Sequence, residues 1–210
     1  MSARHADGLS RPALGLWAAV PWRTVASLTV VGVLLITSAS IWATGPLAAI
    51  AVTLGLAALT ASTSHLLDEA AAEAVDATPT SLRGRTVIRA TTSVGVMALG
   101  VVAMVPLAIR SSSTAPLAIA TQLAGCGLVA LAAAAALRHR MSEPGEVVGG
   151  GLVALILALT IAHPFDRWVD LFPRVEGDRW AGSFAAWSVL GVASLIVLAR
   201  ATRDPLARRR

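Results

Sequence analysis

Six long runs of apolar residues, separated by shorter polar segments, dominate the pattern along this chain of 210 residues. A helix that crosses the hydrocarbon core of a bilayer needs about 20 predominantly apolar residues, with a range of roughly 17–25. The runs are close to this length, and none of them contains an Asp, Glu, Arg or His. The pattern therefore predicts an all-α integral membrane protein with six transmembrane helices, at residues 25–43, 46–64, 90–109, 115–137, 147–162 and 182–199.

Helices are favoured over membrane strands because no run alternates apolar and polar residues, as barrel strands do. The first run has one alternative interpretation, a cleaved signal peptide, since Ser38-Ala39-Ser40 resembles a small-residue cleavage site. The run is longer than the apolar core of a typical signal peptide. We therefore expect the first run to remain in the protein as a transmembrane helix.

The composition supports a membrane protein and gives it an orientation. The chain is 56% hydrophobic and 14% charged, against about 45–50% and 25% in soluble domains. All 17 basic residues are arginines, and 13 of them fall on one side of the six runs, together with both termini. The positive-inside rule then predicts a multi-pass protein of the plasma (inner) membrane with both termini in the cytoplasm.

This orientation divides the chain into a cytoplasmic N-terminal segment (1–24), a six-helix transmembrane domain (25–199) and a basic cytoplasmic tail (200–210). The arginines lie beside apolar runs, so the lipid bilayer explains them better than nucleic acid does. Within 1–24, residues 10–22 are expected to form an interfacial helix, because Leu14, Trp17 and Ala18 share one helical face.

The most polar internal segment is the predicted cytoplasmic loop 65–89. Three of its acids, at i, i+4 and i+7, share one face of a predicted short helix over residues 66–77, and Pro79 ends that helix. The loop could be a solvated connection, or an acidic docking element that complements a basic groove on a cytoplasmic partner. The candidate partner-coupling residues are Asp68, Glu69, Glu73, Asp76, Arg83 and Arg85.

A second unusual segment, residues 163–181, follows the fifth run on the predicted outer face. Phe165, Trp168, Val169 and Phe172 are spaced i, i+3, i+4 and i+7, which predicts one apolar helical face. Prolines stand on both sides of this stretch and are typical of a helix start and stop. We expect a short interfacial or re-entrant helix with its aromatic side chains at headgroup level.

Motifs for catalysis or cofactor binding are not found. His65 and Asp68 form an HxxD pair, as do His163 and Asp166, but the predicted topology places the pairs on opposite sides of the membrane. Two ligands make a poor metal site, and the chain has no GxxxxGK[ST] phosphate-binding loop. We therefore expect no catalytic residue, metal or cofactor, and we interpret Cys126 as a small packing residue.

The absence of charge from the runs bears on energy coupling. Carriers driven by protons or ions usually place ionisable side chains within the bilayer. These runs hold only hydroxyl groups and Gln122 as polar side chains. If the protein transports a molecule, we expect the driving energy to come from a partner.

The layout resembles the membrane subunits of ABC-2-type transporters, and the loop sequence LDEAAAEAVDATPTSLRGR is similar to loops in small actinobacterial membrane proteins of this kind. The family has an inner connecting helix, here 14–20, and a coupling helix between the second and third spans, here 66–77. It also has tight outer turns, here 44–45 and 111–114, and re-entrant outer helices, here 164–180.

The resemblance implies a dimer, either with itself or with a second membrane subunit, bound to a separate cytoplasmic ABC ATPase. It implies export of a hydrophobic or amphipathic substrate, with no catalysis by this chain itself. The alternative is a non-transporting accessory or scaffold subunit of a larger membrane complex.

Overall fold

The computed structural model describes residues 20–42, 45–68, 82–110, 116–138, 140–141, 143–162, 169, 171–172 and 180–202, with the backbone alone for 42, 82–85 and 116–119. Over these residues the chain forms six helices and no strand. All six helices are long and apolar enough to cross a membrane. They are α2 (Trp22–Trp42), α3 (Pro46–His65), α5 (Leu82–Arg110), α6 (Pro116–Leu137), α7 (Pro144–Ala162) and α8 (Trp180–Ala201).

The six predicted runs are confirmed as six helices, with one large difference in the bounds. Helix α5 begins at Leu82, eight residues before the predicted start of the third span at Ala90. No proline or glycine pair interrupts residues 82–89, so the helix continues through the arginines of the predicted loop. Helix α7 also starts early, at Pro144, which suits the first turn because its missing N–H would have no partner there.

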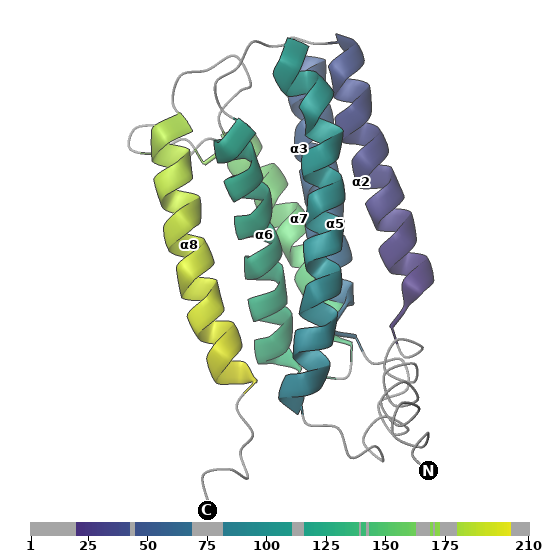
Figure 1. Cartoon of the computed structure of the whole chain (residues 1–210), viewed down its shortest axis with the longest axis vertical. Coiled ribbons are helices and arrows are strands. Elements are labelled where there is room, and N and C mark those ends of the chain that lie inside the picture. Colours follow the sequence, from purple (N-terminus) through teal and green to yellow (C-terminus); the bar gives the residue numbers. More distant parts are fainter. Residues whose placement is uncertain are drawn as a thin grey trace, which may run out of the picture.

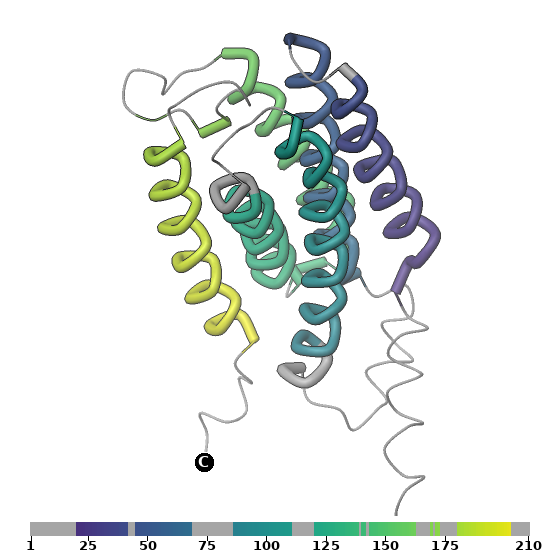
Figure 2. The backbone as a smooth tube through the Cα atoms, turned by 45° about the horizontal axis from the view of Figure 1, so that its top comes forward, coloured from purple at the N-terminus to yellow at the C-terminus, as the bar shows by residue number. Residues whose placement is uncertain are grey.

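The helices alternate in direction, and α3 lies at the centre of the bundle. Helix α3 buries 12 of its 20 residues, whereas α7 buries 5 of 19 and α8 buries 4 of 22. It packs against α2, α5, α6 and α7. Helices α2 and α8 stand at opposite edges of the bundle (Figures 1 and 2), and α8 packs mainly against α6.

Glycines bring the backbones of α2 and α3 together. A Cβ atom on Gly55 would lie 2.8 Å from the Gly32 carbonyl oxygen and 2.6 Å from Cγ1 of Ile36. Small residues allow such close helix approach, which is how membrane helices gain packing contacts without a hydrophobic driving force. Hydroxyl groups add a polar contact at the same interface, since Thr29 Oγ1 and Ser62 Oγ are 2.8 Å apart.

The outer surface of the bundle is apolar, whereas hydroxyl groups lie inside it. Val94, Ile161 and Val189 are 67%, 80% and 69% exposed, while Thr60 and Ser62 are almost fully buried. A soluble protein seldom exposes contiguous apolar surface on every helix. Lipid is the solvent that suits this distribution, which supports a multi-pass membrane protein.

Candidate functional site

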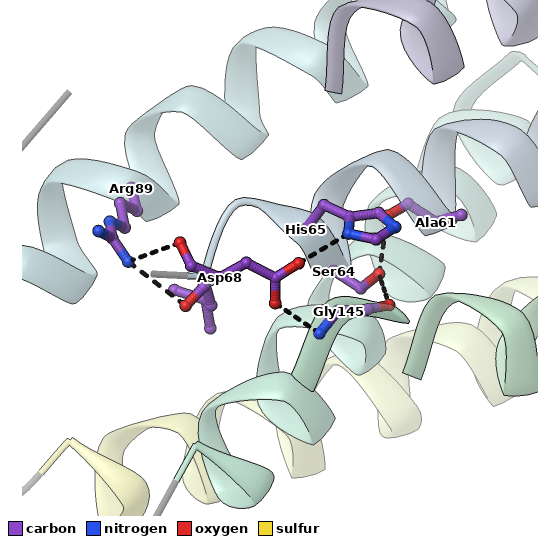
Figure 3. A network of polar contacts seen from close by, with 7 residues as sticks. Ala61, Ser64, His65, Asp68, Arg89 and Gly145 are labelled. Atoms are coloured by element: carbon purple, nitrogen blue, oxygen red, sulfur yellow. Dashed lines mark hydrogen bonds and ion pairs between the residues drawn. The ribbon is translucent and has the colours of Figure 1, made fainter. Parts of the chain in front are cut away.

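Helices α3, α5, α6 and α7 meet at the end of the bundle where Asp68 leads into the charged segment 69–81. Helix α3 ends at His65, and the chain then makes a turn in which the backbone N–H of Leu66 donates to the Thr63 carbonyl. Leu66 and Leu67 are both fully buried. The turn that ends at Asp68 therefore lies inside the end of the bundle, in contact with Gly145 at the start of α7 and with Arg89 of α5 (Figure 3).

Asp68 joins α3 to the start of α7. Its carboxylate is almost fully buried, and Oδ1 accepts a hydrogen bond from the backbone N–H of Gly145 over 2.6 Å. The first N–H groups of a helix lack partners within that helix, so Asp68 caps α7 from a distant position in the sequence. A carboxylate at a helix N-terminus is also favoured by the helix dipole.

His65 completes the surroundings of this carboxylate, since its Nδ1 lies 2.7 Å from Asp68 Oδ2. Both carboxylate oxygens therefore have a partner, as a buried acid requires. The hydrogen bond between His65 and Asp68 therefore stabilises the turn that follows α3. Within the described part of the chain, no three His, Cys, Asp or Glu side chains gather as a metal site would need.

Glycine is required at position 145 because α3 and α7 approach closely there. A Cβ atom on Gly145 would lie 2.7 Å from the His65 Cα atom. Ser64 Oγ donates to the Gly145 carbonyl over 3.1 Å, so both backbone polar groups of this glycine contact the end of α3. Gly149 continues the approach one turn later, where a Cβ would lie 2.8 Å from Ser64 Oγ.

Arg89 connects α5 to the same turn (Figure 3). Its side chain is 2% exposed, and Nη1 donates to the carbonyls of Leu67 and Asp68 over 3.3 and 3.5 Å. These carbonyls follow the end of α3, where backbone acceptors lack helical partners and a cation is favoured. A further bond, from Arg138 to Thr86 Oγ1 over 3.3 Å, joins α6 to α5.

The predicted partner-coupling residues are described only in part. Asp68 is buried, so its carboxylate is not on a solvent-facing surface. Arg83 and Arg85 lie in the first turns of α5, where only the backbone is described. Glu69, Glu73 and Asp76 lie outside the described residues.

Two members of this junction were not predicted from the sequence. Arg89 was assigned to a loop, although it stands in a continuous stretch without a helix breaker. Gly145 carried no signal beyond the Pro-Gly-Glu start of a helix. Gly145 acts through its own backbone and Arg89 acts by binding backbone carbonyls, and hydropathy and motif searches detect neither kind of contact.

At the opposite end of the bundle, one backbone carbonyl accepts three side-chain hydrogen bonds. The Leu171 oxygen receives Trp187 Nε1–H over 2.9 Å, Ser183 Oγ–H over 3.2 Å and Gln122 Nε2–H over 3.3 Å. Next to it, Phe172 packs edge-on against Trp187 with ring centroids 5.6 Å apart. This part of the predicted outer segment is therefore held between α6 and α8.

The predicted outer face is only partly described. Phe172 is 8% exposed and belongs to the main apolar core, so this ring points into the bundle. Val169 is partly exposed, and Val169, Leu171 and Phe172 are not helical. Phe165 and Trp168 lie outside the described residues, and an interfacial helix in this segment stays a prediction.

Cys126 is buried in the centre of α6, as expected for a packing residue.

No family model, curated protein or solved structure matches the chain. The two polar junctions at the ends of the bundle therefore provide the basis for a functional assignment.

Proposed function

We propose that this chain is the membrane subunit of an ABC-2-like transporter that works with a separate cytoplasmic ATPase and a second membrane subunit. The observation that carries the proposal is the way the charged segment 69–81 joins the bundle. On one side it follows Asp68, which is bonded to α7, and on the other it leads into α5, which holds Arg89. Residues 69–81 would then act as the docking element for the ATPase.

Such a junction suits the transmission of motion from a docked partner. A displacement of Asp68 would act directly on the backbone of Gly145 at the start of α7. Arg89 would carry the same displacement into α5. A solvated loop has no need for a buried carboxylate and a buried guanidinium, whose burial is costly unless they are paired.

The chemistry of the spans favours a hydrophobic or amphipathic substrate. The buried polar side chains at the centres of the described helices are hydroxyls, Gln122 lies nearer the start of α6, and the outward surfaces are apolar. Such surroundings offer no fixed charge to recognise an ion. They also supply no coupling group for an ion gradient, so a partner that hydrolyses ATP would provide the energy.

The first experiment is a mild-detergent pull-down of the tagged full chain from its native host, with mass spectrometry of the co-eluting chains. A stoichiometric ATPase with Walker motifs is the expected result. If the chain instead co-purifies with another membrane complex and no ATPase, the transporter proposal is refuted. The chain would then be an accessory or scaffold subunit.

A second experiment tests the docking element. The triple variant Glu69→Ala, Glu73→Ala, Asp76→Ala should remove most of the substrate-stimulated ATP hydrolysis, because it deletes the acidic stripe. The matched control is Glu143→Ala with Glu146→Ala, since both of these acids are exposed on the same end of the bundle. Unchanged stimulation in the triple variant would exclude a coupling role for the stripe.

A further inference from the structure

The last turns of α6 and α8 lie side by side at the end of the bundle that holds Asp68 (Figures 1 and 2). Both helices begin at the Leu171 end and run in the same direction, so they also end together. Leu137 at the end of α6, and Leu198 and Ala201 at the end of α8, pack against the same apolar cluster. This packing holds two helix C-termini next to each other.

Each of these two helix ends carries an arginine with an exposed side chain. Arg200 stands in the last turn of α8. Arg140 follows α6 in a turn, and its backbone N–H donates to the Leu137 carbonyl over 2.8 Å, which keeps the turn against the helix end. Arg138 differs from both, because its guanidinium reaches across to Thr86 on α5. The exposed cations at this place are therefore Arg140 and Arg200, on neighbouring helix ends.

The surface that leads to these arginines is apolar and faces outward. On α8, Val192, Ile196 and Arg200 follow one another at intervals of four residues and share one exposed face. On α6, the exposed Ala136 precedes the turn with Arg140, and its small side chain keeps the surface shallow. An acyl chain can lie along such a face while its headgroup meets the arginines.

We propose that Arg140 and Arg200 bind the headgroup phosphate of an anionic phospholipid, whose acyl chains lie along the outward faces of α6 and α8. Guanidinium groups form strong, charge-assisted hydrogen bonds with phosphate, and basic groups between membrane helices on the cytoplasmic side are suited to such headgroups. A phospholipid fits better than a soluble anion because the face that ends at Arg200 is apolar. The binding does not depend on transport or on an ATPase.

A discrete site differs from the general attraction of a basic surface to an anionic leaflet. Arg23 is also exposed at this end of the bundle, but it stands at the start of α2, at the opposite edge (Figure 1). General attraction would depend on Arg23 and Arg200 equally. The proposed site depends on Arg140 and Arg200 and not on Arg23, so Arg23→Gln is a control that removes the same charge elsewhere.

The purified full chain, in an uncharged detergent, is titrated with phosphatidylglycerol and with phosphatidylcholine of the same acyl chains, and binding is read by native mass spectrometry. We expect the wild type to prefer phosphatidylglycerol. Arg140→Gln and Arg200→Gln should each reduce this preference about fivefold, the usual contribution of one basic residue near a membrane surface. Arg23→Gln should leave it unchanged. Equal losses in all three variants, or a loss in fewer than both of the first two, would overturn the shared site.

Two further measurements complete the test. The Tm of each variant should equal that of the wild type, because the three side chains are exposed, so a lost preference cannot be attributed to unfolding. A large excess of glycerophosphoglycerol, the soluble headgroup without acyl chains, should not displace phosphatidylglycerol from the wild type. Displacement by this soluble anion would show that the acyl chains contribute nothing, and would overturn the assignment to a bilayer lipid.

Discussion

The carboxylate of Asp68 caps α7 by accepting a 2.6 Å hydrogen bond from the backbone N–H of Gly145, 77 positions later in the chain. A helix is usually capped by a residue directly before it. Here the cap comes from the residue that precedes the charged segment 69–81. The start of α7 is therefore sensitive to any change in the position of Asp68.

Replacing Asp68 by Ala should destabilise the bundle. The change leaves the Gly145 N–H without its buried acceptor and removes the partner of His65 Nδ1, and an unsatisfied buried group costs about 1–3 kcal/mol. Thermal unfolding of the purified variant should show a lower Tm. Glu143→Ala, which removes an exposed acid directly before α7, should change the Tm little; similar losses for both variants would argue against the cap.

Gly145→Ala should be harmful, whereas Gly150→Ala should be tolerated. A Cβ at 145 would lie 2.7 Å from the His65 Cα, and nothing lies within 4 Å of a Cβ at 150. Overpacking costs about 1–3 kcal/mol, whereas alanine in an open helical position improves on glycine by up to about 1 kcal/mol. The two Tm values should therefore move in opposite directions, and a shared direction would contradict the close approach of α3 and α7.

The three hydrogen bonds to Leu171 should behave non-additively. Because three donors share one carbonyl, removing Gln122 or Ser183 alone lets the remaining donors move closer. Gln122→Leu and Ser183→Ala should each cost less than about 0.5 kcal/mol, and the double variant should cost clearly more than their sum. A double-mutant cycle in unfolding free energy measures this, and strict additivity would show that the donors act independently.

The orientation can be tested with single cysteines, because the native Cys126 is buried and should give little background labelling. Glu143→Cys, on the predicted cytoplasmic side, should resist a membrane-impermeant maleimide in intact cells and react in inverted vesicles. Ser113→Cys, in a predicted outer turn, should react in intact cells. The reverse pattern would invert the topology inferred from the arginines.

The number and kind of helices were predictable from the sequence because a bilayer-spanning helix needs a long apolar run, and hydropathy reports that directly. The residue at which α5 begins could not be predicted in the same way. Hydropathy treats Arg89 as a loop charge, since it does not distinguish a solvated arginine from one whose donors reach the backbone carbonyls of Leu67 and Asp68.

The polar contacts at the two ends of the bundle could not be predicted from the sequence, for a related physical reason. Asp68 was grouped with the acids that follow it in the sequence, although its partner is a backbone N–H far away in the sequence. The acceptor at the other end is the Leu171 carbonyl, a group that every residue possesses. Contacts of side chains with distant backbone groups leave no residue pattern, so only the folded arrangement reveals them.

The peripheral place of α8 has a consequence for how the protein is made. Every helix that packs against α3 has been synthesised by the time the ribosome reaches Ala162. Of the six described helices, α8 is synthesised last and packs on α6, where Trp187 fits against Gly125 so closely that a Cβ there would lie 2.7 Å from its ring. We therefore expect the insertion of α8 to be a separate late step of biogenesis, guided by its packing against α6.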